Sequence, residues 1–332
     1  MERLFVFLII FLFHQITLSQ VNLNLDIDVR QLTPMKLSDI SEESHYVAFK
    51  MDSIVDFFAA DNFLFVTTGG FFPTILHQYD LSGNIIRTIH NDKKFAFRVD
   101  SKNNRLIHGY VDKLEFWNYN GAFLNDISLP EQTGSDSNSI IGIDQNNIWI
   151  LYQNRQSEKV ACRICRLNTE NGRMETVLER DLPVPNIPFH YKVCYSSFGG
   201  KSYISFPDNV IYEVDGKSVR PAVKYSIRNY RDELTHLLHD SRFAGRYLVV
   251  KYGSTIAKYM IFWYDTKEKR TWQMKIDDWV GGIEDDIFQT GTCDNYQIQG
   301  NFLVFRKQSN DLPEEMNVEK DHTVIFITKL KQ

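Results

Sequence analysis

The stretch YDLSGNIIRTI (Tyr79–Ile89) decides the fold predicted from this sequence. In it an apolar run ends in an aromatic and an acidic residue, a turn containing Gly83 follows, and an alternating run leaves the turn. Approximate copies recur as FWNYNGAFLNDISL, CRLNTENGRMETVL, YEVDGKSVRPAV and WYDTKEKRTWQMKI. Because a short turn suffices to join antiparallel neighbours, each copy predicts a β-hairpin.

These hairpins belong to a longer repeat. From about Met51 onward, the chain divides into six similar stretches of roughly 40 to 50 residues, each built from short apolar runs. The second run of each stretch is the clearest: NFLFVTT, RLIHGYV, NIWILYQ, KSYISF, RYLVVKYG and NFLVFRK. These runs are rich in β-branched and aromatic residues and follow turn formers, so they predict strands of antiparallel sheets.

The two ends of the chain supply a separate indication. The sixth stretch has only three runs and stops at Gln332, whereas HYVAFK (His45–Lys50) is one extra run before the first stretch. If the extra run completes the sixth sheet, no sheet edge there is left unpaired. The sequence therefore predicts an all-β fold, a six-bladed β-propeller of four-stranded antiparallel blades, with the last blade closed by the N-terminal strand.

At this point the sequence resembles the six-bladed β-propeller proteins of Bacteroidota, which are related to the NHL and TolB-like propellers. A lead-in segment LSDI (Leu37–Ile40) precedes the closing strand. The first blade matches the family motif at Asp61, Asn62, Phe65, Tyr79, Asp80 and Gly83, whereas the fifth blade lacks the turn glycine. The resemblance covers essentially the whole mature chain. It implies an envelope or secreted propeller of mostly unassigned role.

The N-terminus predicts an export signal. Arg3 precedes the apolar block LFVFLIIFLF (Leu4–Phe13), and Thr17 and Ser19 offer small residues for cleavage before Gln20. The block is shorter than the ~20 apolar residues that a membrane-spanning helix needs. An uncleaved membrane anchor is the alternative interpretation. No cysteine lies near the cleavage point, so a lipoprotein anchor is not indicated.

The predicted organisation is a signal peptide over residues 1–19 and one propeller domain over residues 20–332. Residues 20–50 form the N-terminal segment with the closing strand. We expect a monomer without a transmembrane anchor, periplasmic or secreted after cleavage between Ser19 and Gln20. The chain has 332 residues and a formal net charge of -5, which argues against a nucleic-acid partner.

Four cysteines occur: Cys162, Cys165, Cys194 and Cys293. The first two lie three apart in the alternating run KVACRICRL, where they point to opposite faces of a strand and cannot share a metal. Free thiols are the expected state, with a disulfide of unknown pairing as the alternative in an oxidising compartment.

Seven residues are candidates for ligand binding on the loop-rich rim and at the axial mouth. They are Phe71, Phe72, Arg98, His190, His236, Trp279 and Asp285. The three aromatic residues offer platforms for a sugar or peptide, or else they fix their own loops. His190 begins the first run FHYKVCYS, and Arg98 lies in the run FAFRVD, so both would face the channel and bind an anionic group there, or else take part in ordinary hydrogen-bonded packing. His236 shares a helical spacing with His239, without the further ligand that a zinc site needs.

Calcium could be bound by the carboxylate oxygens of an acidic cluster, which contains Glu284, Asp285 and Asp286, with Asp277 and Asp278 nearby. Its order matches no compact calcium loop, so a solvated acidic loop is the alternative. Otherwise no cofactor is expected. The sequence contains no GxSxG, P-loop, HExxH or dinucleotide motif.

We therefore expect a binding or interaction module that presents its loop-rich face to an envelope protein, peptide or glycan. A carbohydrate- or lactone-active hydrolase with a channel-mouth site and a divalent metal is the alternative. A structural or sensor-associated propeller is the third.

Overall fold

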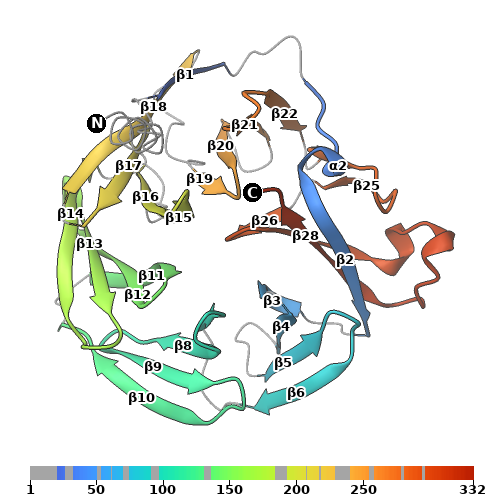
Figure 1. Cartoon of the computed structure of the whole chain (residues 1–332), viewed down its shortest axis with the longest axis horizontal. Helices are drawn as coiled ribbons and strands as arrows, with labels where there is room; N and C mark the ends of the chain where they lie inside the picture. Colours follow the sequence, from blue (N-terminus) through green and yellow to red (C-terminus); the bar gives the residue numbers. More distant parts are fainter. Residues whose placement is uncertain are drawn as a thin grey trace, which may run out of the picture.

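A computed structural model describes most of the chain after residue 20. The described residues are 21–26, 33–50, 54–60, 62–69, 75–90, 97–130, 136–183, 193–206, 208–216, 218–228, 240–253, 258–277, 280–293 and 296–332. They form six antiparallel blades of four strands, arranged around a central axis (Figure 1). The predicted six-bladed β-propeller is confirmed.

The first three blades follow one another along the chain, each running from an inner to an outer strand. Blade 1 contains β3 (Ile54–Ala60), β4 (Phe63–Thr68), β5 (Ile75–Asp80) and β6 (Ile85–His90). Blade 2 contains β7 (Phe97–Asp100), β8 (Arg105–Gly109), β9 (Lys113–Asn118) and β10 (Phe123–Ser128). Blade 3 contains β11 (Asp136–Asp144), β12 (Asn147–Arg155), β13 (Lys159–Asn168) and β14 (Met174–Pro183).

The last three blades carry the additions to the regular plan. Blade 4 contains β15 (Cys194–Phe198), β16 (Lys201–Phe206), β17 (Val210–Asp215) and β18 (Ser218–Arg228). Blade 5 contains β19 (Asp240–Ala244), β20 (Tyr247–Gly253), β21 (Lys258–Asp265) and β22 (Thr271–Asp277), with β23 (Val280–Gly281) on its edge. Blade 6 contains β26 (Tyr296–Gln299), β27 (Phe302–Gln308), β28 (Thr323–Leu330) and β2 (Ser41–Phe49). The hairpin of β24 (Ile283–Asp285) and β25 (Gly291–Cys293) lies between blades 5 and 6 in the sequence.

The turn of the opening stretch shows why the hairpins recur. Asp80 ends β5, and its carboxylate accepts hydrogen bonds from the N–H groups of Ser82 and Asn84, each at 2.9 Å. Gly83 has a φ of +87°, which glycine adopts without the strain of a side chain. Tyr79, which precedes the turn, is buried in the core. The aromatic residue therefore anchors the strand, and the acidic residue folds the turn.

The ring closes where the sequence predicted. β2 pairs with β28 in antiparallel register, with His45 opposite Ile327 and Val47 opposite Ile325. The closing strand is thus the outer strand of blade 6, and it lies beside the last strand of the chain (Figure 1).

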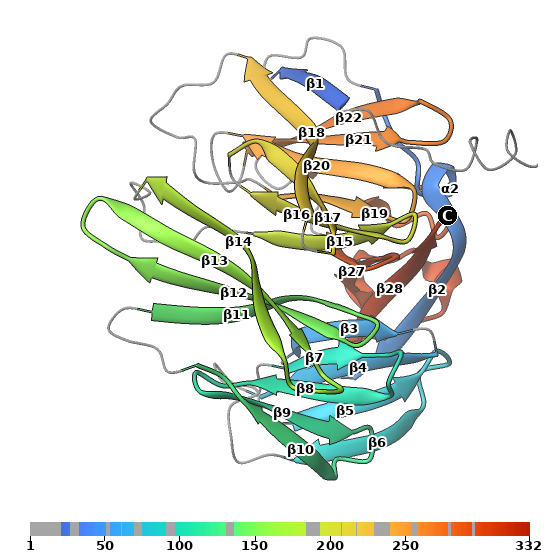
Figure 2. The same cartoon turned by 60° about the vertical axis from the view of Figure 1, so that its left-hand side comes forward.

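The path that leads to this closing strand was not predicted. β1 (Val21–Asp26) adds a fifth, parallel strand to the outer edge of blade 4, beside β18 (Figure 2). Further on, Thr33 forms a bridge with Gln273 of blade 5, and Lys36 forms one with Glu284 of β24. The N-terminal segment therefore crosses the outside of blades 4 and 5 before it joins blade 6.

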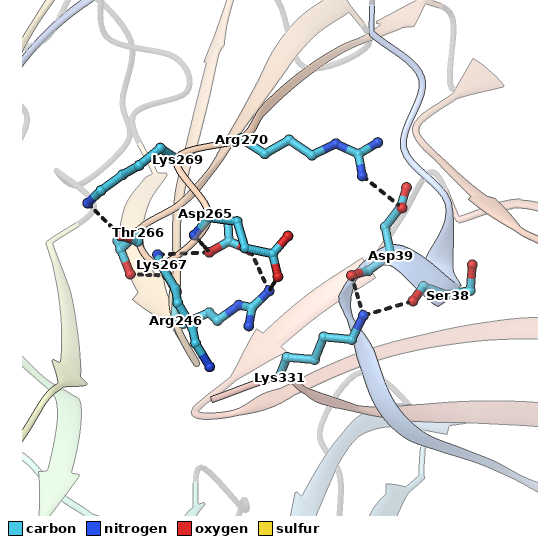
Figure 3. Close-up of polar contacts among 10 residues, drawn as sticks. Ser38, Asp39, Arg246, Asp265, Thr266, Lys267, Lys269, Arg270 and Lys331 are labelled. Atoms are coloured by element: carbon cyan, nitrogen blue, oxygen red, sulfur yellow. Dashed lines mark hydrogen bonds and ion pairs between the residues drawn. The ribbon is translucent and has the colours of Figure 1, made fainter.

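A network of polar contacts, which we call the closure network, fixes the seam (Figure 3). The helical turn α2 (Leu37–Ile40) precedes β2, and Lys331 Nζ donates to the carbonyl oxygens of Ser38 and Asp39 at 3.2 and 2.7 Å. Arg270 in turn binds the Asp39 carboxylate at 3.2 Å. The ammonium group of Lys331 thus lies at the C-terminal end of α2 and donates to carbonyl groups of that helical turn.

The closure network continues into blade 5. Arg246 binds the buried carboxylate of Asp265 at 2.7 Å and the exposed carboxylate of Glu268 at 2.6 Å. Burial acts to lower the pKa of Arg246, but hydrogen bonds to these carboxylates raise it on balance. Gly245 has a φ of +56°, and a Cβ there would lie 2.6 Å from the carbonyl oxygen of Lys331. The end of the chain is therefore held tightly against this turn.

Six clusters of buried apolar residues fill the six boundaries between blades. Fully buried members are Leu64 and Ile325 between blades 6 and 1, Phe65 and Leu106 between blades 1 and 2, Ile107 and Ile148 between blades 2 and 3, Ile164 and Ile204 between blades 3 and 4, Tyr203 and Val250 between blades 4 and 5, and Trp263 and Leu303 between blades 5 and 6. Cooperative packing of neighbouring blades therefore stabilises the whole ring.

The cysteines follow the prediction made from strand geometry. Cys162 lies in the cluster between blades 3 and 4, whereas Cys165 lies in the cluster between blades 2 and 3. All four cysteines are buried free thiols. Within the described residues, no helix has the length and apolar character needed to cross a membrane.

Candidate functional site

The six inner strands enclose an axial cavity of about 800 Å³. Each of them contributes to its wall, including Asp56, Arg98, Ser139, Ser196, Arg242 and Gln297. The inner strands all begin at the same end of the ring, because every blade runs up and down in the same order. We call this end the mouth rim. The second-to-third connections and the blade-to-blade connections return to it, as predicted.

Most of the predicted ligand-binding residues lie outside the described residues. They are Phe71, Phe72, His190, His236 and Trp279. Of the described pair, Arg98 faces the axial cavity as expected, whereas Asp285 lies in the hairpin next to blade 6. The structure thus does not bring these two residues together in one site.

Asp285 is 2% exposed and is used by its own hairpin. Its carboxylate accepts hydrogen bonds from the N–H groups of Ile287, Phe288 and Thr290 at 3.2, 3.0 and 3.3 Å, and from the Thr290 hydroxyl. These bonds hold the turn between β24 and β25. The structure therefore gives Asp285 a structural role, and its proposed role in ligand binding stays a prediction without support here.

The neighbouring acidic residues do not form a metal site in the described part of the chain. Asp286 accepts hydrogen bonds from the N–H and hydroxyl groups of Ser38, at 3.0 and 2.6 Å, and Glu284 is exposed. Asp278 lies outside the described residues. No group of three His, Cys, Asp or Glu side chains converges among the residues that the structure describes.

Polar side chains join the inner strands to one another. At the boundary of blades 6 and 1, Gln299 donates to the carbonyl of Phe57 at 2.7 Å and accepts from the N–H of Ala59 at 2.8 Å. At the boundary of blades 5 and 6, Arg242 donates to the carbonyl of Ile298 at 3.2 Å. Gln299 and Arg242 thus use polar groups near the axis to hold blades together.

Similar bonds join blades 4 and 5 and blades 3 and 4. The N–H of Phe243 donates to Ser196 Oγ at 3.0 Å, and the hydroxyl of Tyr195 donates to the carboxylate of Asp144 at 2.6 Å. Blades 2 and 3 are joined by the Asn138 side chain, which donates to main-chain carbonyls of blade 2 at 3.0 and 3.3 Å. Five of the six boundaries therefore carry a direct bond from an inner strand.

The boundary of blades 1 and 2 differs. The charges of Asp56 on β3 and Arg98 on β7 interact. Among the described residues, however, the two side chains form no ion pair within 4.0 Å. Within the described part of the chain, the one hydrogen bond of Arg98 runs from Nη1 to the carbonyl of Phe97, at 3.1 Å, and the guanidinium lies 5.7 Å from the ring centroid of Phe58. Opposite charges thus remain next to the cavity without a direct bond between them.

The surroundings of both charges disfavour the charged forms. Burial raises the pKa of the Asp56 carboxyl above its ordinary value, against the opposing effects of the Phe57 N–H and the Arg98 charge. Water reaches Arg98 from the cavity, yet the enclosing walls lower the pKa of its guanidinium, although Asp56 acts to raise it. Titratable groups with shifted pKa values in a concave site are typical of functional positions.

We expect Asp56→Asn to increase the free energy of unfolding at neutral pH. The pKa of Asp56 is higher in the folded state than in the unfolded state, so the ionised carboxylate costs stability. This cost develops as the pH rises from the unfolded pKa of about 4 through the folded pKa. Urea unfolding over a pH series measures it: the variant and the wild type should agree in acid and separate above that pH.

The matched control is Asp112→Asn, since Asp112 is an exposed turn residue. This control should show no such separation. A lower stability of Asp56→Asn at neutral pH would contradict the inferred cost of the Asp56 charge.

Comparison with known proteins does not assign the chain to a family. No family model matches the chain, and neither does any curated protein. Similar solved structures include the WD40 domain of Pan2 from Neurospora crassa, with a TM-score of 0.44 and 11% identity over 90% of this chain and 100% of that chain. A protein of unknown function from Bacteroides caccae has a TM-score of 0.39 and 11% identity over 74% of this chain and 82% of that one.

An oligogalacturonate lyase in complex with manganese has a TM-score of 0.42 and 11% identity, covering 89% of this chain and 92% of that chain. Scores and identities of this size support no argument about activity. The Bacteroidota propeller family that the sequence resembles therefore stays a prediction, and the function has to be argued from the cavity.

Proposed function

We propose that this protein is a binding module that takes its ligand in the axial cavity, through the mouth rim. The observation that carries this proposal is the unbridged pair of Asp56 and Arg98 beside the cavity. At the other five boundaries the inner strands use polar groups to hold blades together. At this boundary the two charged groups are not paired with each other, and both line the cavity, where a ligand can reach them.

The size and lining of the cavity support the same proposal. Its volume of about 800 Å³ lies in the range of known small-molecule sites, ~300–1,000 Å³. Ser139 and Gln297 add exposed polar side chains to its wall. A peptide end or a glycan unit would fit such a cavity. We propose that the protein acts in the periplasm or outside the cell, as the export signal predicts.

The hydrolase alternative gains no support from the described residues. Catalysis of that kind needs converging carboxylates or a metal site, and no group of three metal-binding side chains occurs in the described part of the chain.

The binding proposal is tested with a substitution that fills the cavity with a large side chain. Ser139 on β11 lines the cavity and is exposed, so Ser139→Trp should obstruct it without removing a buried contact. The purified protein is incubated with a low-molecular-mass extract of the source cells, and retained compounds are identified by native mass spectrometry. We expect the wild type and Ser139→Ala to retain a compound that Ser139→Trp loses. Equal retention by all three proteins would contradict binding in the cavity.

A further inference from the structure

Arg98 offers the cavity an unused edge of its guanidinium group. A guanidinium carries five N–H donors, and Arg98 donates through Nη1 to the carbonyl of Phe97. No other hydrogen bond of Arg98 occurs within the described residues. The edge formed by Nε and Nη2 is therefore available, and this planar edge matches the two oxygens of a carboxylate.

The charges around Arg98 favour one negative charge on the ligand rather than two. The other arginine of the cavity wall, Arg242, is engaged by Asp240 through Nε and Nη2, at 2.9 and 2.7 Å, and by the carbonyl of Ile298. Asp56 adds a negative charge near the Arg98 site. A doubly charged phosphate would thus meet one available cation and one repelling carboxylate, whereas a carboxylate meets a matching partner.

Asp56 indicates a second group that the ligand must carry. Its carboxylate accepts the N–H of Phe57 at 2.9 Å and a hydrogen bond from the Gln297 side chain, and it interacts with the charge of Arg98. The carboxylate is half-buried, and its two oxygens can accept further hydrogen bonds, so a ligand hydroxyl or ammonium group would stabilise it. Asp56 and Arg98 line the same cavity and their charges interact, so a ligand in that cavity can contact both side chains.

We infer that the ligand of the axial cavity carries a carboxylate, bound by Arg98, and close to it a hydroxyl or ammonium donor, bound by Asp56. This inference rests on the proposed function and names the ligand class of that site. Sugar acids supply the hydroxyl form of this chemistry, and amino acids supply the ammonium form.

Isothermal titration calorimetry with four probes tests the class. D-glucuronate represents the hydroxyl form and L-alanine the ammonium form, whereas acetate lacks the donor and D-glucose lacks the carboxylate. We expect one of the first two probes to bind at least about tenfold more tightly than both control probes. Arg98→Gln should weaken that binding by about tenfold or more, since a charge-assisted bidentate contact is lost. Asp56→Asn should weaken it too, while Ser139→Ala should not.

The inference is overturned if neither D-glucuronate nor L-alanine binds better than the control probes, or if Arg98→Gln binds as the wild type does. Capture from the cell extract separates this failure from failure of the proposed function. If Ser139→Trp loses the retained compound but Arg98→Gln keeps it, the cavity binds a ligand of another class. If Ser139→Trp also keeps it, binding in the cavity itself is contradicted.

Discussion

A chain that begins at residue 51 is expected not to fold into a closed ring. It lacks α2, β2 and the residues before them, and with them the buried apolar side chains of Met35, Leu37, Ile40, Val47 and Phe49. At ~1.5–3 kcal/mol for each, their burial is worth on the order of 10 kcal/mol. This is as large as the whole net stability of a typical domain, about 5–15 kcal/mol. Near-ultraviolet circular dichroism should therefore show loss of fixed tertiary packing.

The control is a chain that begins at residue 27, which lacks only β1 and keeps the closing strand. It should retain a cooperative unfolding transition at lower stability. A synthetic peptide of residues 33–50 should restore the spectrum of the shorter chain by pairing with β28. A stable, cooperatively folded chain from residue 51 without the peptide would refute the importance of the closing strand.

Arg246→Leu is expected to lower the free energy of unfolding by about 3–5 kcal/mol. The substitution leaves the carboxylate of Asp265, which is 0% exposed, without its cation at the seam of the ring. The N–H groups of Lys267 and Glu268 still donate to the other oxygen of Asp265, but they do not replace the charge. Urea denaturation of the wild type and the variant measures the difference.

Two further variants separate the buried contact from the surface contact of Arg246. Glu268→Gln should cost less than ~1 kcal/mol, because the Glu268 side chain is 58% exposed. The double variant Arg246→Leu, Asp265→Leu should recover much of the lost stability, since it removes the unpaired buried charge. A double variant as unstable as Arg246→Leu alone would show that packing, rather than charge, explains the loss.

The sequence predicted the fold because the propeller is built from local hairpins repeated at one period. Tyr79 and Asp80 carry both the buried anchor and the turn bonds of such a hairpin, so the pattern is visible within a few residues. The closing strand was found because the last blade lacked a run. The position of β1 was not found, because VNLNLD is a short alternating run whose parallel partner β18 lies about 200 residues away in the chain.

The site was predicted only in part. Arg98 in FAFRVD was expected to face the channel, and Asp56 in SIVDFFAA occupies a similar place but was overlooked. Asp56 and Arg98 are both charged residues near the start of an inner strand, and Arg242 follows the same pattern. This pattern could have identified all three residues. Asp285 was misleading because the sequence displays an acidic cluster but does not show which carboxylates the hairpin itself uses.

The seam between β2 and β28 also sets the order in which the molecule can assemble. The hydrogen bond between Ser44 and Thr328 joins residues that lie 284 positions apart. The first of these strands leaves the ribosome long before its partner exists, so the sixth blade is completed only when synthesis has ended. Contacts of such long range slow folding, and the closing strand has no partner until the last blade has been made.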